Sequence, residues 1–307
     1  MAVYQKGLLF IDEGGHCYVT QQKPDIYNLG DDLCSPRHYY DFLAQTPTSA
    51  MVVGGGVFTD FGYQCLKMKS TDINIIWGFG LSRPLEIKDN ESFLKKTIKK
   101  IKLTYKRSVV EQKYHFRSSR DPLVVALGYP FVPCPSCFHA ITDLPIKNNG
   151  VGVIINANPD THGAEVEDSL RGLRKRFPDV IFATNDMTQA QAMAFFGQVD
   201  KIITNSYHFA YWALLSGRHI DVIAYSTKFK GLLELFNLTT YRSYKKQDAQ
   251  SLINHLESAL QSPNWIHAAD YEVFKKEFRS LNNDFAKNIS ALSSLTVRLK
   301  EPFRSRD

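Results

Sequence analysis

The second half of the chain alternates short apolar runs with amphipathic stretches, and this alternation predicts βαβ units. Each apolar run has four or five residues and precedes a stretch with helical spacing. The expected strands are 151–155, 180–183, 201–204 and 221–224, and the expected helices are 164–177, 187–196 and 207–216. Strands that alternate with helices form parallel sheets through right-handed crossovers.

The first half contains two buried-strand candidates that end in glycines. Residues 50–53 run into a triple glycine at 54–56, and residues 73–77 run into Gly78 and Gly80. Such transitions are typical of the carboxyl edge of a parallel α/β sheet, where ligands gather. A turn-rich stretch at 145–150 then predicts a domain boundary. We therefore expect an α/β chain of two Rossmann-like domains, 1–147 and 148–307, with parallel sheets facing a cleft.

Composition is consistent with a folded protein of the cytoplasm. Of the 307 residues, 44% are hydrophobic and 22% charged, which is an ordinary globular balance. Five cysteines are too few and too irregular for a disulfide framework. No apolar run approaches the roughly 18 to 20 residues that span a bilayer, and residues 1–13 carry no legible secretory signal.

The net charge of +6 comes from one segment. Seven basic residues and no acid lie between Lys95 and Arg107, so the rest of the chain carries 6 minus 7, or −1. A nucleic-acid binder usually spreads its basic residues over a whole face, so we expect no nucleic-acid partner. Apolar residues at helical spacing run through the segment: Leu94, Ile98, Ile101 and Tyr105. It is therefore either a solvated helix face over an ordinary core or a helix that lies on an anionic membrane.

A glycine motif and a cysteine motif could each bind a ligand or simply form a tight turn. The triple glycine at 54–56 lets backbone N–H groups approach an anion or a sugar, but tight turns use glycine without any ligand. It matches neither the dinucleotide fingerprint nor the P-loop. Cys134 and Cys137 have the spacing of half a zinc site and lack a second pair, so we expect a turn and no metal.

Candidate anion-binding and proton-transfer residues follow other predicted strands. Arg117 and Arg120 precede a helix whose first turn holds Pro122, which is either an anion site or a surface ion pair. His208 and Lys228 follow two adjacent strands. Histidine suits proton transfer near neutral pH and lysine suits phosphate. Alone, His208 fits a packed or capping residue equally well, but its pairing with Lys228 favours a functional role.

In their order, these motifs resemble the polysaccharide pyruvyl transferases. The motifs are Asn28-Leu29-Gly30-Asp31-Asp32-Leu33 with Pro36, the glycines 54–56, Trp77 to Gly80, Arg120-Asp121, and Ser206-Tyr207-His208 with Gly217 and Lys228 after it. The chain departs from the family at Ser206, where many members have arginine. If that arginine grips the donor, Arg117, Arg120 or Lys230 has to replace it.

The resemblance implies two Rossmann-like domains similar to the GT-B glycosyltransferases, and a function. Pyruvate would pass from phosphoenolpyruvate to two hydroxyls of a bacterial surface glycan or its polyprenyl-diphosphate-linked precursor, as a cyclic ketal, without metal or other cofactor. The implied residues are His208 and Asp31 for catalysis, Arg117, Arg120, Ser206, Lys228 and Lys230 for the donor, and Asn28, Gly55, Gly56 and Asp60 for the acceptor.

Such an enzyme would work in the cytoplasm, at the inner face of the cytoplasmic membrane where its acceptor is made. Two other functions stay open. One is a GT-B glycosyltransferase that uses a nucleotide sugar, because architecture alone does not separate the two. The other is a glycan-binding scaffold that has kept the fold and lost activity.

Overall fold

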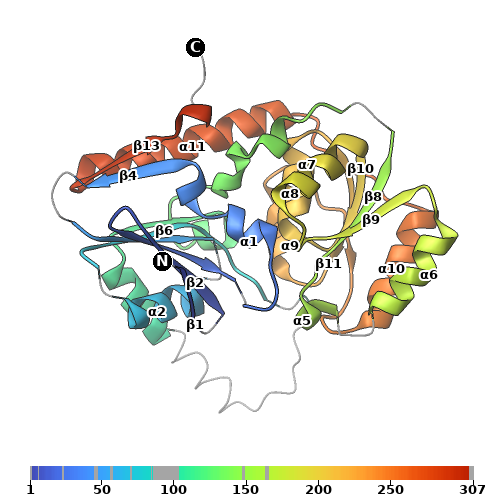
Figure 1. Cartoon of the computed structure of the whole chain (residues 1–307), viewed down its shortest axis with the longest axis horizontal. Helices are drawn as coiled ribbons and strands as arrows, with labels where there is room; N and C mark the ends of the chain where they lie inside the picture. The colour runs from blue at the N-terminus through green and yellow to red at the C-terminus, as the bar shows by residue number, and fades with distance from the viewer. Residues whose placement is uncertain are drawn as a thin grey trace.

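The structure is a computed structural model that describes residues 2–5, 7–22, 24–44, 48–55, 58–69, 71–83, 85, 104–146, 149–162 and 166–303, without the side chains of 58–60, 123, 162 and 302. It consists of two α/β halves, joined along one side by a long C-terminal helix (Figure 1). This confirms the predicted α/β class and the two Rossmann-like domains that face a cleft. No helix among the described residues is long and apolar enough to cross a membrane.

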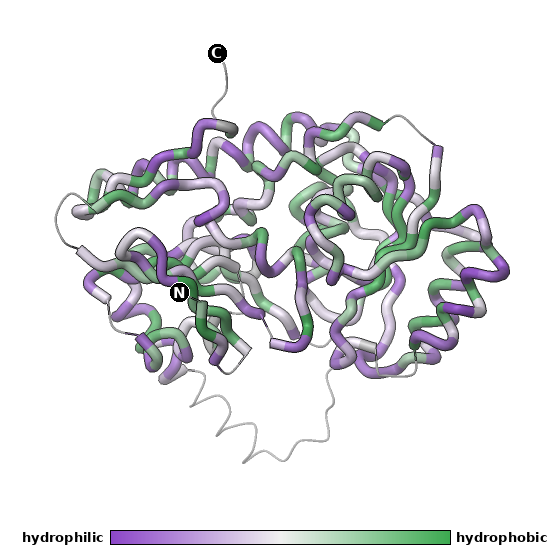
Figure 2. The backbone as a smooth tube through the Cα atoms, in the orientation of Figure 1, coloured by the Kyte–Doolittle hydropathy of each residue, from purple (hydrophilic) through white to green (hydrophobic). Residues whose placement is uncertain are grey.

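The second half holds a fully parallel sheet of order β12-β11-β10-β8-β9. Its strands are β8 (Val151–Ile155), β9 (Val180–Thr184), β10 (Lys201–Thr204), β11 (His219–Ala224) and β12 (Arg242–Ser243). In chain order this is the doubly wound arrangement 2-1-3-4-5, whose direction of winding reverses between β8 and β10. Each predicted strand and helix of this half is present, and Figure 2 shows hydrophobic positions concentrated on its interior strands.

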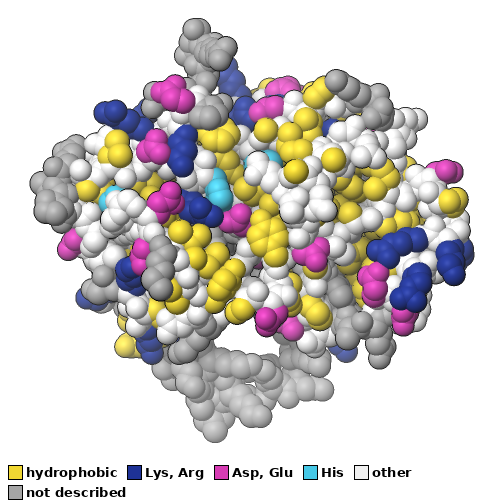
Figure 3. All heavy atoms as spheres, viewed as in Figure 1, with side chains coloured by type: hydrophobic (Ala, Val, Ile, Leu, Met, Phe, Trp, Pro, Cys, Tyr) yellow, Lys and Arg dark blue, Asp and Glu magenta, His cyan; other side chains and the backbone are white. Residues whose placement is uncertain are grey.

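Helices cover both faces of this sheet. They are α5 (Pro159–His162), α6 (Val166–Arg176), α7 (Gln189–Gln198), α8 (Tyr207–Leu215), α9 (Thr227–Glu234) and α10 (Ala249–Gln261). Every residue of α8 is buried, as expected of a helix that is apolar all round. By contrast, α6 and α10 lie outside. Helix α6 carries both signs of charge, paired as in Arg174 with Glu167, and its Arg176 pairs with Glu257 of α10 (Figure 3).

The first half departs from the prediction of a parallel sheet, because its sheet is mixed. The order is β1-β2-β3-β5-β6-β7. Its strands are β1 (Ala2–Gln5), β2 (Leu8–Glu13), β3 (His16–Gln21), β5 (Ala50–Gly54), β6 (Ile73–Phe79) and β7 (Phe116–Ser119). The first three form an antiparallel meander, and only β3, β5, β6 and β7 run parallel.

Alternate side chains of the parallel strands enter two different cores. Val52 and Trp77 face the large core that continues into the second half. Val53 and Ile76 face a smaller core under α2 (Phe58–Met68) and a helix over residues 104–113. Successive strand residues point to opposite faces of the sheet. Because both faces are buried here, these strands are apolar throughout and do not alternate apolar with polar residues.

Short elements connect the halves and line the space between them. They are α1 (Leu29–Leu33), η1 (Pro36–His38), α4 (Pro122–Val125), η2 (Pro135–Phe138), η3 (Ala140–Asp143) and η4 (Glu301–Phe303). Cys134 precedes η2 and Cys137 lies inside it, so this motif forms a 3-10 helix where we predicted a turn. All five cysteines are free and buried.

The end of the chain returns to the first half. Helix α11 (Tyr271–Leu292) packs there, and β13 (Leu295–Leu299) pairs antiparallel with β4 (Tyr40–Ala44) (Figure 1). The sequence placed all residues from 148 onward in the second domain, and this pairing assigns the last strand to the first half instead. Trp77 anchors the return, since its ring lies 4.9 Å from Phe285 of α11, centroid to centroid.

We predict that Asn282 of α11 stabilises this crossing. The indole N–H of Trp77 donates to its Oδ1 at 2.6 Å, and its amide donates to the carbonyl oxygens of Phe278 and Pro133. Replacing a buried partner leaves these groups unsatisfied, so Asn282→Leu should lower the free energy of unfolding by about 1–3 kcal/mol in urea melts. The control is Asn288→Leu on an exposed turn of α11, which should change it by less than about 0.5 kcal/mol. Equal stability of the two variants would contradict the role of Asn282.

Candidate functional site

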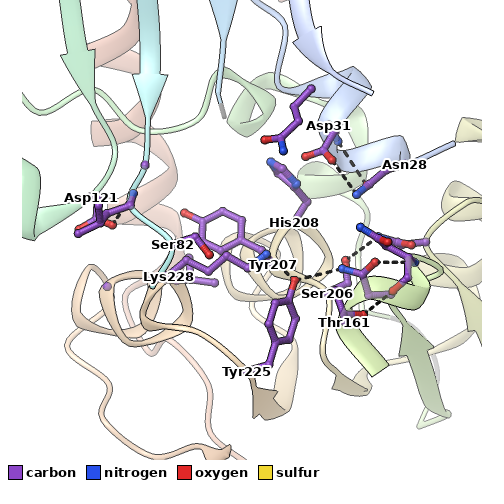
Figure 4. A pocket seen from close by; sticks show the side chains of 18 of the residues that line it. Asn28, Asp31, Ser82, Asp121, Thr161, Ser206, Tyr207, His208, Tyr225 and Lys228 are labelled. Atoms are coloured by element: carbon purple, nitrogen blue, oxygen red, sulfur yellow. Dashed lines mark hydrogen bonds between the residues drawn. The ribbon is translucent and has the colours of Figure 1, made fainter. Parts of the chain in front are cut away.

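A polar pocket of about 180 Å³ lies between the two halves, at the carboxyl ends of β8 and β10. This is the point where the winding of the second sheet reverses, and doubly wound proteins bind ligands there. The first half contributes α1 and the loops after β6 and β7, and the second half contributes the loops after β8, β9, β10 and β11 (Figure 4).

Helix α1 is fixed onto the second half although it belongs to the first by sequence. Asn28 caps it by accepting from the N–H groups of Gly30 and Asp31, and the N–H of Leu29 donates to the carbonyl of Asn185. A Cβ at Gly30 would lie 2.3 Å from Nδ1 of His208. Only glycine therefore allows the backbone of α1 to pack against this histidine.

His208 accepts a hydrogen bond and is neutral. Its Nε2 lies 3.5 Å from Nη1 of Arg120. Because a guanidinium only donates, Nε2 is the acceptor and the proton belongs on Nδ1. Burial, and then the charges of Arg120 and Lys228, hold the pKa of His208 well below its ordinary value. The side chain is only 5% exposed, and a neutral imidazole with an unprotonated Nε2 is a base rather than an acid.

Arg120 is the group that stands beside this histidine. Its guanidinium lies over the ring of Tyr207, 4.7 Å from the centroid, and a Cβ at Gly80 would meet its Nε at 3.2 Å. No carboxylate among the described residues forms an ion pair with it. A half-buried guanidinium in such surroundings favours an anionic ligand.

Lys228 is a second cation in the same pocket. Its Nζ donates to the hydroxyl of Tyr225 at 2.7 Å and lies 5.3 Å from the ring centroid of Phe229. Burial is the main reason that the pKa of Lys228 is lowered to about 8, with Asp31 opposing the shift and Arg120 adding to it. Burial likewise raises the pKa of Asp31 to about 6, against the pull of Lys228 and Arg120.

Asparagines fix the loops on the second sheet, and we did not predict them. Asn156, Asn185 and Asn205 each follow a strand of that sheet. The Oδ1 of Asn205 accepts from the N–H of Asn156, and the Oδ1 of Asn185 accepts from the N–H of Ala157, both at 2.7 Å. An asparagine directly after each of three successive strands is a pattern in the sequence that could have indicated these loop-fixing residues.

The structure brings six of the predicted site residues together around this pocket. They are Asn28, Asp31, Arg120, Ser206, His208 and Lys228. The Nδ2 of Asn28 donates to Asp31 at 2.9 Å, so this side chain caps α1 and positions Asp31 rather than pointing freely to an acceptor. The hydroxyl of Ser206 accepts from the amide of Asn185 at 3.4 Å.

Two predicted donor residues lie elsewhere. Arg117 is inside β7, donates to the carbonyl of Glu111 and lines a different groove, because it lies before the end of its strand. Lys230 is 59% exposed and lies 3.8 Å from Glu234. It follows Lys228 by two helical positions, about 200° around α9, so it faces away from the pocket.

The predicted acceptor glycines and Asp60 are not part of the described pocket. Gly55 has a φ of +63°, and a Cβ there would meet Sγ of Cys34 at 2.7 Å and Nη1 of Arg120 at 3.4 Å. Gly55 therefore packs against the guanidinium of Arg120, and its lack of a side chain leaves space for that group. Gly56 and the side chain of Asp60 lie outside the described residues, as does most of the basic run from Lys95 to Arg107.

Comparisons with known proteins leave the family open. No family model and no curated protein matches the chain. Among solved structures, a proposed UDP-N-acetylglucosamine 2-epimerase from Listeria monocytogenes is 11% identical, with a TM-score of 0.41 over 79% of this chain and 74% of that chain. No cluster of three or more His, Cys, Asp or Glu side chains in the described ranges is arranged to hold a metal ion.

We predict that the pocket binds a dianion less tightly as Lys228 loses its proton. Sulfate keeps its charge across this range, so its affinity should fall about tenfold between pH 7 and pH 9, as the lysine titrates near pH 8. Titration calorimetry measures this fall. Lys228→Arg should give a flat profile, because arginine stays charged. Lys230→Ala, the exposed neighbour on α9, should follow the unmodified protein, and a flat profile there would contradict the assignment.

Proposed function

We propose that the protein transfers pyruvate from phosphoenolpyruvate to two hydroxyls of a sugar, forming a cyclic ketal. The observation that carries the proposal is the convergence of Arg120, Lys228 and His208 on one pocket between the two halves. Phosphoenolpyruvate carries a phosphate and a carboxylate and so requires at least two cations. Neither cation has an acidic partner in ion-pair contact among the described residues, so both are available to it.

Arg120 is the best candidate to replace the arginine that this chain lacks at Ser206. It comes from the other half of the molecule and still places a guanidinium 3.5 Å from His208. Arg117 and Lys230, the other candidates, face away from the pocket. The departure from the family pattern at Ser206 is therefore compatible with donor binding.

Asp31 and His208 have proton affinities suited to the two transfers that the reaction needs. Asp31, with a pKa of about 6, gives a proton to the methylene carbon of the donor, and the adjacent carbon then takes a sugar oxygen. Neutral His208 accepts the proton of one hydroxyl and passes it to the departing phosphate. The second hydroxyl closes the ketal and returns its proton to Asp31, so one hydroxyl proton ends on the methyl group and the other on phosphate.

The acceptor side of the pocket is polar and mostly uncharged. Asn158 and Thr161 line it, with Lys246 as the one further cation that the described lining includes. Neutral hydrogen-bonding groups suit sugar hydroxyls. We therefore propose a glycan or a polyprenyl-diphosphate-linked oligosaccharide as the acceptor, with no nucleic-acid partner, and a cytoplasmic protein that works at the inner face of the membrane.

The direct test is phosphate release from phosphoenolpyruvate with a panel of free and lipid-linked glycans. We predict acceptor-dependent release, and a fall in turnover on the order of 10² to 10⁴ in His208→Ala, the range for loss of one positioned acid or base. Mass spectrometry of the glycan should show a pyruvyl adduct. Unchanged turnover in His208→Ala would refute its proton-transfer role.

A matched pair of lysine variants separates donor binding from general damage. Lys228→Ala should raise the KM for phosphoenolpyruvate, and Lys230→Ala should leave it unchanged. If nucleotide sugars raise the melting temperature of the protein and phosphoenolpyruvate does not, a glycosyltransferase replaces our proposal. If glycans bind tightly and no donor gives product, a glycan-binding scaffold replaces it.

We also propose that the basic run from Lys95 to Arg107 holds the protein at anionic membranes. Each lysine or arginine near such a surface contributes roughly 1 kcal/mol, so half of the seven would suffice for reversible binding. The prediction is sedimentation with anionic but not neutral vesicles, weakened by salt and lost when Lys95, Lys96, Lys99 and Lys100 become glutamine. Equal recovery in the supernatant with both lipids would leave a solvated helix face.

A further inference from the structure

The hydroxyl of Tyr225 receives two hydrogen bonds inside the pocket. Nζ of Lys228 donates to it at 2.7 Å and Nδ2 of Asn156 donates to it at 3.2 Å. The orientation of the Asn156 amide is fixed, because its Oδ1 accepts from the N–H of Asn158 at 3.0 Å. A phenol oxygen accepts two hydrogen bonds, so both of its acceptor positions are filled.

The proton of this hydroxyl has no acceptor within the described part of the chain. Neither neighbouring group can take it, since an ammonium and an amide nitrogen only donate. The side chain is 5% exposed and lines the pocket, where Figure 4 shows its hydroxyl between Lys228 and the loop after β8. A buried donor without a partner is costly, and a ligand acceptor would satisfy it.

We propose that Tyr225 binds the anionic ligand directly, by donating its hydroxyl proton to a phosphate or carboxylate oxygen. Lys228 and Asn156 occupy the acceptor positions of the hydroxyl oxygen, so its proton is available to a ligand that also lies beside the charge of Lys228. The other charged or titratable groups around the pair come from four elements. They are Asp31 from α1, Arg120 and Asp121 after β7, Tyr207 and His208 from α8, and Tyr244 and Lys246 after β12. The name of the anion rests on the proposed function, but the role of Tyr225 toward an oxyanion does not.

The test is sulfate affinity at pH 6, where Lys228 is protonated. Tyr225→Phe should weaken binding about ten- to a hundredfold, the range for a hydrogen bond to a charged group. Tyr244→Phe is the matched control. Its hydroxyl also accepts from an asparagine, Asn205, but donates its proton to the carbonyl of Thr161, so this variant should keep affinity within about twofold.

A second comparison distinguishes direct binding from support of Lys228. In a Lys228→Met background, Tyr225→Phe should still weaken sulfate binding. If its effect disappears there, Tyr225 only positions the lysine and the proposal is wrong. Should Tyr225→Phe fail to fold, 3-fluorotyrosine at this position keeps the ring and makes a stronger donor. It should tighten binding, and unchanged affinity would overturn the proposal.

Phosphoenolpyruvate as a second probe separates this inference from the function. If sulfate binding depends on Tyr225 while phosphoenolpyruvate does not bind the unmodified protein, the proposed function fails and the role of Tyr225 stands. If phosphoenolpyruvate binds equally well to Tyr225→Phe, the role of Tyr225 fails and the proposed function stands.

Discussion

Two half-buried cations, with no ion-paired carboxylate among the described residues, are the constraint around which the site is built. Placing Arg120 and Lys228 in one pocket costs desolvation and mutual repulsion. The fold offsets part of this with aromatic faces, Tyr207 under the guanidinium and Phe229 beside the ammonium, and with the hydroxyl of Tyr225. The remaining positive charge favours binding of an anion. No described residue supplies that anion as an ion-paired carboxylate.

That arrangement depends on how closely the halves approach. Arg120 follows a strand of the first sheet and His208 follows one of the second, and α1 lies directly on the histidine beside their contact. Gly30 allows this by having no side chain. The halves are also joined away from the pocket, because β13 pairs with β4 and α11 packs beside Trp77. The geometry of the site is thus set partly by the last strand of the chain.

The sequence predicted local features well and long-range ones poorly. Buried strands of the second sheet are apolar runs bounded by turns, so their positions were legible, as were the strand ends that carry His208 and Lys228. The pairing of β13 with β4 was not, since no local pattern links segments about 250 residues apart. Arg117 and Lys230 lie away from the pocket, because we chose them by charge and did not consider the strand position or helix face of each side chain. We missed Tyr225 because the hydrogen bonds that its hydroxyl accepts from Lys228 and Asn156 are visible only in the folded structure.

The proton affinities in the pocket connect anion binding with proton transfer. Asp31 titrates near pH 6 and Lys228 near pH 8, and Arg120 does not titrate. At neutral pH these three groups sum to one positive charge, because Asp31 is mostly ionised and His208 is neutral. A dianion that enters makes the local charge negative and raises the pKa of each neighbour. It therefore favours protonation of Asp31, the group that we propose as the acid. In this scheme, binding of the donor favours uptake by Asp31 of the proton that the methylene carbon requires.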